Sequence, residues 1–172
     1  MIFDSTTHFL QSEIRPVFRS FRKCLVKSNL CGIISPRGEK CGLKAVQTDL
    51  AVLSGYMKKI SPWIVVEYRS RILNIHPSLL PRHGGKGMYG DRVHLAVLQS
   101  GDTQSGATVH LLSEEYDEGS VLLQREVAVT VDETLESLKS KVRQLEGPLC
   151  IEAISKFMHN HALQSDAATQ RR

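Results

Sequence analysis

Four apolar stretches with the length of β-strands lie within residues 49–129. LAVLSG (50–55) is a continuous apolar run ended by glycine, which is typical of a strand that is covered on both faces, and ILNI (72–75) predicts a second buried strand. ATVHLL (107–112) and VLLQREVAV (121–129) follow, and the second alternates apolar and polar residues toward its end. Helix-like segments separate several of these runs. The order therefore predicts an α/β domain with an open, mostly parallel sheet, in which the final strands are candidates for antiparallel pairing.

Helix signals lie between these strands. Ser61 and Pro62 predict an N-cap and a proline at the first helical position for the segment WIVVEY. Asp91 is a candidate N-cap for a second helix through RVHLAVLQS, and Gly101 stands just after its expected end. Both helices are short enough to connect neighbouring strands of one sheet.

A longer helix is predicted after the last strand. Thr130 and Glu133 have the spacing of a capping box, which predicts the start of this helix. Gly147-Pro148 is expected to kink or interrupt it, and the polar tail 159–172 is expected to be frayed. Apolar residues at mostly three- and four-residue steps mark one core-facing stripe: Leu135, Leu138, Val142, Leu145, Leu149, Ile154 and Phe157.

Residues 1–48 give weaker signals. CGIIS (31–35) predicts a short strand, followed by a turn and the start of a helix. The segment is rich in Arg, Ser and Thr, a composition found both in organelle transit peptides and in basic solvated arms. We therefore expect an atypical basic segment (1–48), a folded domain (49–158) and a polar tail (159–172).

Composition narrows the class of protein. With 172 residues, 41% hydrophobic and 23% charged, the chain has the balance of one globular domain. No apolar run approaches the roughly 20 residues that a membrane-spanning helix needs, so no membrane partner is expected. The net charge of +4 comes from residues 1–48, where eight Lys and Arg face three acids. The rest of the chain is near neutral and aromatic residues are few, so nucleic acid is not an expected partner. The four cysteines lack a C-x-x-C spacing, which argues against a zinc site or a disulfide framework.

Polar residues with catalytic potential stand where two strands are expected to end. Asn74 and His76 close the apolar run ILNI, and Pro77 stiffens the chain after them. In open α/β sheets ligands bind where strands end. An amide can donate to a developing oxyanion, and an imidazole exchanges protons near neutral pH. Asp117 lies in an acidic loop between two predicted strands, and a carboxylate beside an imidazole raises the pKa of the imidazole. Each signal alone also fits a structural histidine or a solvated turn, whereas their combination predicts an acid–base site.

Four segments, in this order and with these gaps, resemble the phosphoribosylglycinamide formyltransferase family: DLAVLSGYMKKI, RILNIHPSLLP, GATVHLLSEEYDEGSVLLQ and RQLEGP. The resemblance covers Asp49 to about Phe157. It implies a Rossmann-like formyltransferase fold and a catalytic domain over residues 49–158. It also implies 10-formyltetrahydrofolate as co-substrate, no metal, and transfer of the formyl group to the amine of glycinamide ribonucleotide in purine (IMP) biosynthesis.

The resemblance implies roles for individual residues. Asn74 is similar to the asparagine that holds the formyl oxygen, and His76 to the catalytic histidine. Asp117 is similar to the aspartate that raises the pKa of that histidine and relays protons through water. Glu146 is similar to a helix glutamate that meets the substrate amine, with an exposed helix charge as the alternative. Two segments are similar to the walls of the folate site: Met57, Lys58, Lys59 and Ile60, and Ser113, Glu114, Glu115, Tyr116 and Asp117.

The N-terminal part departs from the family pattern. Residues 1–48 lack the glycine-rich loop that cradles the substrate phosphate at a helix N-terminus. The family's third strand is also missing before TDLAVLSG, so we expect an incomplete N-terminal part with exposed strand edges. Three hypotheses follow: an active formyltransferase, a folate-binding remnant without turnover, and a formyltetrahydrofolate hydrolase. The hydrolase is the least expected, because that family reads His-His-Ser-Phe-Leu-Pro where this chain has HPSLLP.

Further expectations concern the surroundings of the site. HGGKGMYG (83–90) lacks the spacing of a phosphate loop and is expected as a flexible excursion at the mouth of the site. His94 and His110 are expected as packing or supporting residues. The expected partners are small molecules, and the expected state is a monomer or a weak homodimer. The expected location is the cytoplasm, with the plastid as the alternative.

Overall fold

The computed structural model describes residues 24–27, 50–57 and 59–169. Five strands form one sheet in sequence order. The first three pair in parallel, and the third, fourth and fifth pair antiparallel, so the sheet is mixed, with the final strands antiparallel as predicted. The strands are β1 (Cys24–Lys27), β2 (Leu50–Leu53), β3 (Ile72–His76), β4 (Gln104–Leu111) and β5 (Val121–Ala128).

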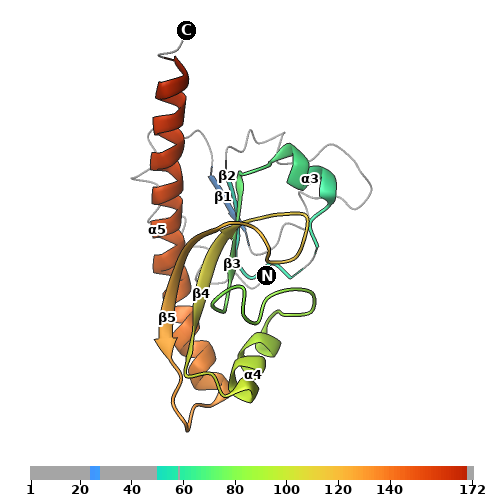
Figure 1. Cartoon of the computed structure of the whole chain (residues 1–172), viewed down its shortest axis with the longest axis vertical. Coiled ribbons are helices and arrows are strands. Elements are labelled where there is room, and N and C mark those ends of the chain that lie inside the picture. Colours follow the sequence, from blue (N-terminus) through green and yellow to red (C-terminus); the bar gives the residue numbers. More distant parts are fainter. Residues whose placement is uncertain (1–23, 28–49, 58, 170–172) are drawn as a thin grey trace.

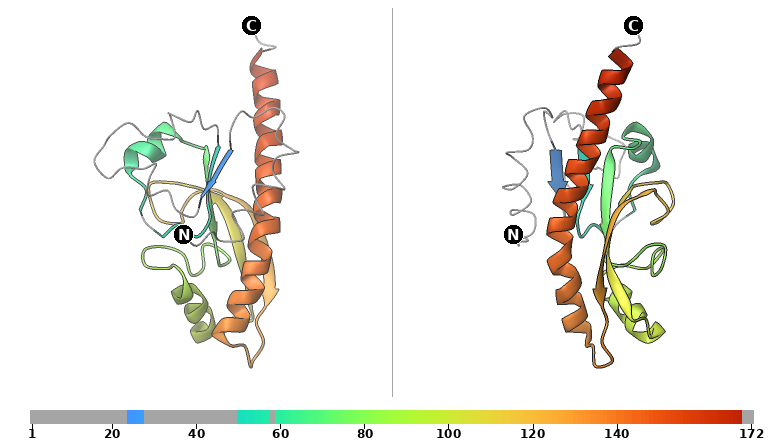
Figure 2. Two further views of the ribbon diagram at one scale, coloured as in Figure 1. Left: turned by 180° about the vertical axis from the view of Figure 1, so that it is seen from behind. Right: turned by 60° about the vertical axis from the view of Figure 1, so that its left-hand side comes forward.

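Helices cover both faces of this sheet. The long helix α5 (Leu135–Thr169) runs along one face, and α3 (Pro62–Glu67) lies on the other (Figures 1 and 2). The third described helix, α4 (Asp91–Ser100), contacts α5 near the end of the sheet where α5 begins (Figure 1). This three-layer arrangement requires the inner strands to be apolar on both sides.

Strand β2 shows why its apolar run is continuous. Leu50 and Val52 point into the core under α5, whereas Ala51 and Leu53 point into the core under α3. All four side chains are at most 2% exposed. Because alternate residues of a strand face opposite sides, a strand between two helical layers must be apolar at every position. The prediction of a doubly covered strand at this place is confirmed.

The short helices start close to where they are predicted. Pro62 is the first residue of α3, although the Ser61 side chain makes no capping hydrogen bond and its carbonyl accepts from Ile64 N instead. The prediction of Asp91 as an N-cap is wrong, because Gly90 is the cap residue and Asp91 is the first residue of α4. The Asp91 carboxylate pairs instead with Lys139 of α5. Gly101 ends α4 in a left-handed conformation, as predicted.

The long helix departs from its prediction at both ends. Thr130 and Glu133 do make the contact of a capping box, yet α5 begins only at Leu135. Immediately before it, Thr134 Oγ1 accepts from Ser137 N at 3.2 Å, so Thr134 caps the helix. Of the kink or interruption expected at Gly147-Pro148, the interruption is wrong, since α5 is one continuous helix with Pro148 inside it. Where a frayed polar tail was expected from residue 159, the helix continues to Thr169.

The stripe predicted on this helix does face the core. Leu138, Val142, Leu149, Ile154 and Phe157 are buried against the sheet, while Leu135 and Leu145 are partly buried. Neither α5 nor any other helix among the described residues holds an apolar stretch that could cross a bilayer.

The N-terminal part of the sheet differs from expectation. The predicted strand 31–35 lies outside the described residues. Strand β1, which the sequence did not predict, pairs in parallel with β2 along the edge of β2 that faces away from β3. Strand β2 therefore has a partner on each side, β1 and β3, where an exposed edge was expected.

Candidate functional site

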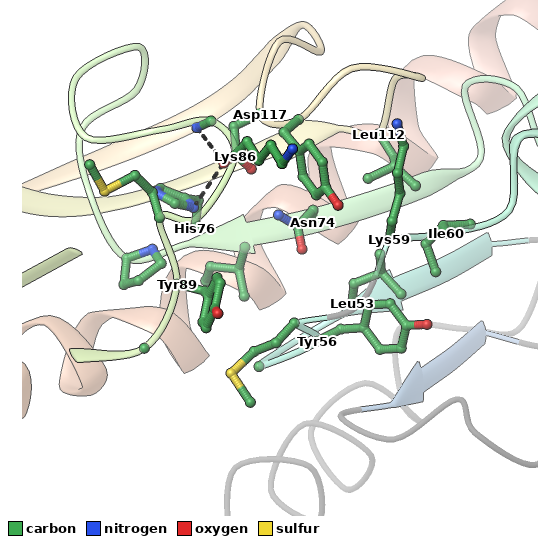
Figure 3. A pocket seen from close by; sticks show the side chains of 18 of the residues that line it. Leu53, Tyr56, Lys59, Ile60, Asn74, His76, Lys86, Tyr89, Leu112 and Asp117 are labelled. Atoms are coloured by element: carbon green, nitrogen blue, oxygen red, sulfur yellow. Dashed lines mark hydrogen bonds and ion pairs between the residues drawn. The ribbon is translucent and has the colours of Figure 1, made fainter. Parts of the chain in front are cut away.

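A cavity of about 570 Å³ opens at the carboxyl ends of β2 and β3. This is the edge of an α/β sheet where ligands bind, because the strands stop and side chains from several loops can converge. Figure 3 shows Asn74 and His76 projecting from β3 toward this space. The other walls come from Leu53 at the end of β2 and Gly55, Tyr56, Met57, Lys59 and Ile60 after it, from Val65 of α3, the loop 85–90, His94 of α4, the β4–β5 loop 112–117, and Lys139, Arg143 and Glu146 of α5.

The site residues predicted from sequence gather around this one cavity. Asn74, His76 and Asp117 line it together, although they come from β3 and from a loop about 40 positions further along the chain. Lys58 lies outside the described residues. The other predicted residues also line the cavity: Met57, Lys59, Ile60, Ser113, Glu114, Glu115, Tyr116 and Glu146.

His76 is held between two hydrogen-bond acceptors. Its side chain is buried, with Nε2 2.9 Å from the carbonyl oxygen of His83 and Nδ1 3.5 Å from Asp117 Oδ2. A carbonyl can only accept, so Nε2 of His76 carries a proton and donates it. The Nδ1 atom faces the carboxylate of Asp117, and the dashed line between them is drawn in Figure 3.

The pKa of His76 reflects opposing influences. Burial disfavours the charged ring and is the largest influence, whereas Asp117 and the His83 carbonyl favour it. The net result is a pKa below the ordinary histidine value. Asp117 raises this pKa as expected, but burial lowers it by more.

Asp117 is fixed by the shape of its loop. It adopts a left-handed backbone conformation with φ of 57°, and its Oδ2 accepts from Gly85 N at 2.9 Å. Burial would raise the pKa of Asp117, but His110, His76 and the Gly85 amide together hold this pKa below its usual range. Gly119 allows the loop to turn back, because a Cβ there would lie 1.6 Å from the Leu111 carbonyl oxygen. The carboxylate is thus held charged beside the imidazole.

His110 joins the other members of the site. It is fully buried opposite Asn74 on the neighbouring strand, and its Nε2 accepts from Asn74 Nδ2 at 3.1 Å. Its Nδ1 lies 3.0 Å from the Leu111 carbonyl oxygen and its Nε2 lies 3.6 Å from Asp117 Oδ1. Sequence reasoning treated His110 as a packing or supporting residue and did not place it in the site. The sequence signal that could have placed His110 in the site is that Asn74 and His110 each stand inside one of two apolar strands that are neighbours in the sheet.

The remaining walls combine an apolar slot with charged groups. Leu53, Ile60 and Leu112 line one side of the cavity (Figure 3), and the Lys59 ammonium lies 5.2 Å from the centre of the Tyr116 ring. On another side His94 is buried, and its Nδ1 has no hydrogen-bond partner among the described residues. Burial and the nearby Lys139 lower the pKa of His94. Among the described residues, no group of three or more His, Cys, Asp or Glu side chains is placed to hold a metal ion.

Fold and site together define an α/β domain with an acid–base cluster at the ends of its parallel strands. The family model described as "Formyl transferase" matches residues 39–154, and the chain belongs to this family.

Individual relatives carry more specific names. The chain is 46% identical over 112 residues to the chloroplastic phosphoribosylglycinamide formyltransferase of Arabidopsis thaliana. The aligned residues cover 65% of this chain and 38% of the relative. It is 39% identical to the crystal structure of phosphoribosylglycinamide formyltransferase from Brucella melitensis, with a TM-score of 0.60 over 67% of this chain and 57% of that one. It is also 27% identical to the crystal structure of a formyltetrahydrofolate deformylase from Pseudomonas syringae, with a TM-score of 0.60 over 66% of this chain and 36% of that one. The chain spans between 9% and 56% of the length of five curated relatives.

Proposed function

We propose that this protein transfers a formyl group from 10-formyltetrahydrofolate to the amine of glycinamide ribonucleotide, a step of purine (IMP) biosynthesis. Family membership supports formyl transfer, and the names of the relatives at 36–46% identity support this particular acceptor. The observation that carries the proposal is the convergence of Asn74, His76 and Asp117 on one cavity at the strand ends. The chain spans between 38% and 56% of the length of these relatives, so the activity of this chain on its own needs a direct assay.

The chemistry begins with attack of the substrate amine on the formyl carbon, which places negative charge on the formyl oxygen. Asn74 is suited to hold that oxygen. Its side-chain amide has two N–H donors, and His110 accepts one of them, so the other remains for a ligand in the cavity. An amide already oriented by a buried partner needs no reorganisation when the charge develops, which is the condition for strong stabilisation of an oxyanion.

His76 supplies the proton in this proposal. A protonated His76 beside the cavity stabilises the developing oxyanion and then gives its proton to the folate nitrogen that leaves. Because burial keeps the pKa of His76 below its ordinary value, the ring releases this proton readily at neutral pH. The bond between the formyl carbon and the folate nitrogen then breaks, and the proton that the attacking amine loses returns the ring to the charged state, which Asp117 favours against the effect of burial.

Folate and amine have separate places in the proposed site. The pteridine ring is placed in the slot between Tyr56, Met57, Lys59 and Ile60 on one side and the loop 113–117 on the other, all of which line the cavity. Glu146 of α5, on the wall that it shares with Arg143, is the proposed contact of the substrate amine.

A two-substrate assay tests the proposal. Purified full-length protein is mixed with 10-formyltetrahydrofolate with and without glycinamide ribonucleotide, and tetrahydrofolate is measured by its absorbance. The proposal predicts product only when the ribonucleotide is present. If folate analogues bind in calorimetry and the ribonucleotide neither binds nor reacts, the chain is a folate-binding remnant and the proposal fails.

A second candidate is hydrolysis of 10-formyltetrahydrofolate, and the likeness to the deformylase structure is the observation that favours it. A hydrolase uses water in place of the amine and releases formate. Formate produced at the same rate with and without glycinamide ribonucleotide would establish this second function and overturn the first.

We further propose a plastid location, in preference to the cytoplasm expected from sequence. The chloroplastic names of two plant relatives support it, as does the basic composition of residues 1–48. Import of the labelled chain into isolated chloroplasts, with protection from added protease, is the expected result. Exclusion from the organelle would contradict it.

A further inference from the structure

A second histidine–carboxylate pair lies just outside the cavity. His83 Nε2 is 2.7 Å from Asp102 Oδ2, and the two side chains are 16% and 9% exposed. Asp102 stands in the turn between α4 and β4, directly after the left-handed Gly101. The same carboxylate also pairs with Arg82, whose side chain is 65% exposed. Asp102 thus lies between two regular elements, α4 and β4, and holds a histidine that belongs to the loop after β3.

The backbone of His83 has an unusual conformation. Its φ is +54°, in the left-handed region that side-chain-bearing residues seldom adopt. Such a conformation persists only when its surroundings hold it in place. The hydrogen bond from the His83 ring to Asp102 holds the side chain of this residue. The main-chain carbonyl of His83 points toward the site.

The carbonyl of His83 is the group that reaches the catalytic histidine of the proposed function. Its oxygen accepts from His76 Nε2 at 2.9 Å. The donating nitrogen is thereby committed to the backbone, which leaves Nδ1, facing Asp117, as the nitrogen able to exchange a proton with a ligand. If the carbonyl turned away, the neutral ring could carry its proton on either nitrogen.

We infer that His83 and Asp102 form a positioning pair for His76. Asp102 holds the His83 ring, the ring holds the left-handed backbone, and the His83 carbonyl fixes the orientation and the tautomer of His76 so that Nδ1 exchanges the proton. The catalytic part of this inference rests on the proposed function. The positioning itself is a property of the folded chain and is measurable without any substrate.

The loop has other anchors that remain when this pair is broken. Thr108 Oγ1 accepts from Leu80 N at 3.1 Å and donates to the Ser78 carbonyl at 2.6 Å. Gln124 Nε2 donates to the Leu80 carbonyl at 2.8 Å, and Ser78 Oγ donates to the Arg82 carbonyl at 2.7 Å. Residues 78–82 are thus fixed on β4 and β5 independently. Loss of Asp102 is expected to release the backbone at His83 without unfolding the loop.

The test compares three variants of the full chain. Asp102→Ala removes the acceptor, Asp102→Asn keeps one oxygen that can accept from His83, and Arg82→Ala removes the exposed partner alone. The ring nitrogens of His76 are followed by ¹⁵N-labelled nuclear magnetic resonance, with His76→Ala used to assign the signals. The titratable and charged groups that face His76 are Asp117, His110, His83 and His94, and none of them is altered.

In the original chain the neutral His76 ring should show the Nε2–H tautomer. Asp102→Ala should give a mixture of tautomers and move the titration midpoint of His76 to lower pH, because the His83 carbonyl favours the charged ring. Asp102→Asn should restore most of the original signature, and Arg82→Ala should match it. Where formyl transfer is measurable, Asp102→Ala should lower kcat about tenfold with little change in KM, the cost of a misplaced catalytic group.

Two results would overturn the inference. An unchanged His76 signature in a folded Asp102→Ala protein would show that the carbonyl is held by other contacts. If Asp102→Ala and Asp102→Asn lowered kcat equally and left the His76 tautomer unchanged, Asp102 would have a role in stability alone. Absence of formyl transfer in the original chain would refute the proposed function but leave the spectroscopic comparison fully interpretable.

Discussion

At the scale of single residues, the site depends on polar groups that are buried yet paired. His110 is fully buried and both of its ring nitrogens have neighbours, Leu111 O on one side and Asn74 Nδ2 on the other. A buried imidazole without such partners would be costly. These partners also decide which atom of Asn74 is free to face the cavity.

Replacing Asn74 by Ala should lower kcat by about 10²–10³, the usual effect of losing one oxyanion donor. Binding of a folate analogue should be unchanged, because the lost contact matters mainly in the transition state. Steady-state kinetics with calorimetry measure both. Asn160→Ala, at an exposed position of α5, is the matched control and should behave like the original chain. Equal losses in kcat and in folate affinity would show that Asn74 only binds.

Replacing Asp117 by Asn should change the pH dependence of the rate. The proposed reaction needs protonated His76, so its rate should fall as the pH rises through the pKa of this residue. Asp117 raises that pKa, and its removal should shift the falling limb of the profile to lower pH. The logarithm of kcat against pH measures the shift. A limb that stays in place, or that moves to higher pH, would remove Asp117 from this role.

At the scale of elements, the start of α5 is held by a carboxylate with several partners. Glu133 accepts from Ser137 and pairs with Lys141, and it also contacts Thr130. The Lys141 ammonium is the main reason that the pKa of Glu133 falls to about 2 from its ordinary 4.5. The capping box predicted from sequence therefore exists as a contact that precedes the helix rather than as its first turn.

Glu133→Gln should lower the free energy of unfolding at neutral pH. A carboxyl whose pKa is depressed in the folded state stabilises the protein above its unfolded pKa, and this contribution is lost as the pH falls toward the folded value. The difference between the two proteins should be constant above about pH 5 and should narrow as the pH falls from 4.5 toward 2. Urea unfolding at several pH values measures it. A difference that is independent of pH would show that the charge is not responsible.

Substitutions at two glycines distinguish the cost of a steric clash from the cost of a left-handed backbone conformation. A Cβ at Gly101 meets nothing within 4 Å, so Gly101→Ala should cost only the left-handed conformation, about 1–2 kcal/mol. A Cβ at Gly119 would meet the Leu111 carbonyl oxygen at 1.6 Å, so Gly119→Ala should cost more and should displace Asp117. Urea unfolding ranks the two variants. An equal cost would show that the β4–β5 loop yields freely.

The sequence predicted most of what is local and least of what depends on distant pairing. Strand β2 was visible because burial on both faces requires an unbroken apolar run, and β3 because Asn74 alone interrupts its apolar residues before His76. Asn74 and His76 were visible because they interrupt such a run at its end. The role of His110 was not visible, since it follows from the register of β4 against β3. The His83–Asp102 contact joins positions 19 residues apart through a loop whose shape no local pattern specifies.

At the scale of the whole molecule, one cavity is assembled from separate parts of the chain. The loop after β2, the end of β3, the loop between β4 and β5, and α5 each contribute a wall. The sheet keeps these parts in register, and α5, which is held on the sheet by its buried stripe, brings Lys139, Arg143 and Glu146 to the cavity. Asn74, His76, His110 and Asp117 contact one another across β3, β4 and the β4–β5 loop, so we expect a change in one of these elements to disturb the others.

The most direct test of the account follows the formyl group itself. The full chain is incubated with 10-formyltetrahydrofolate labelled with ¹³C in the formyl carbon and with glycinamide ribonucleotide, and the products are separated by mass spectrometry. The account predicts that the label appears in the formylated ribonucleotide, and that His76→Ala lowers its rate of appearance by about 10²–10⁴. Label found only in free formate, or an equal rate in His76→Ala, would contradict it.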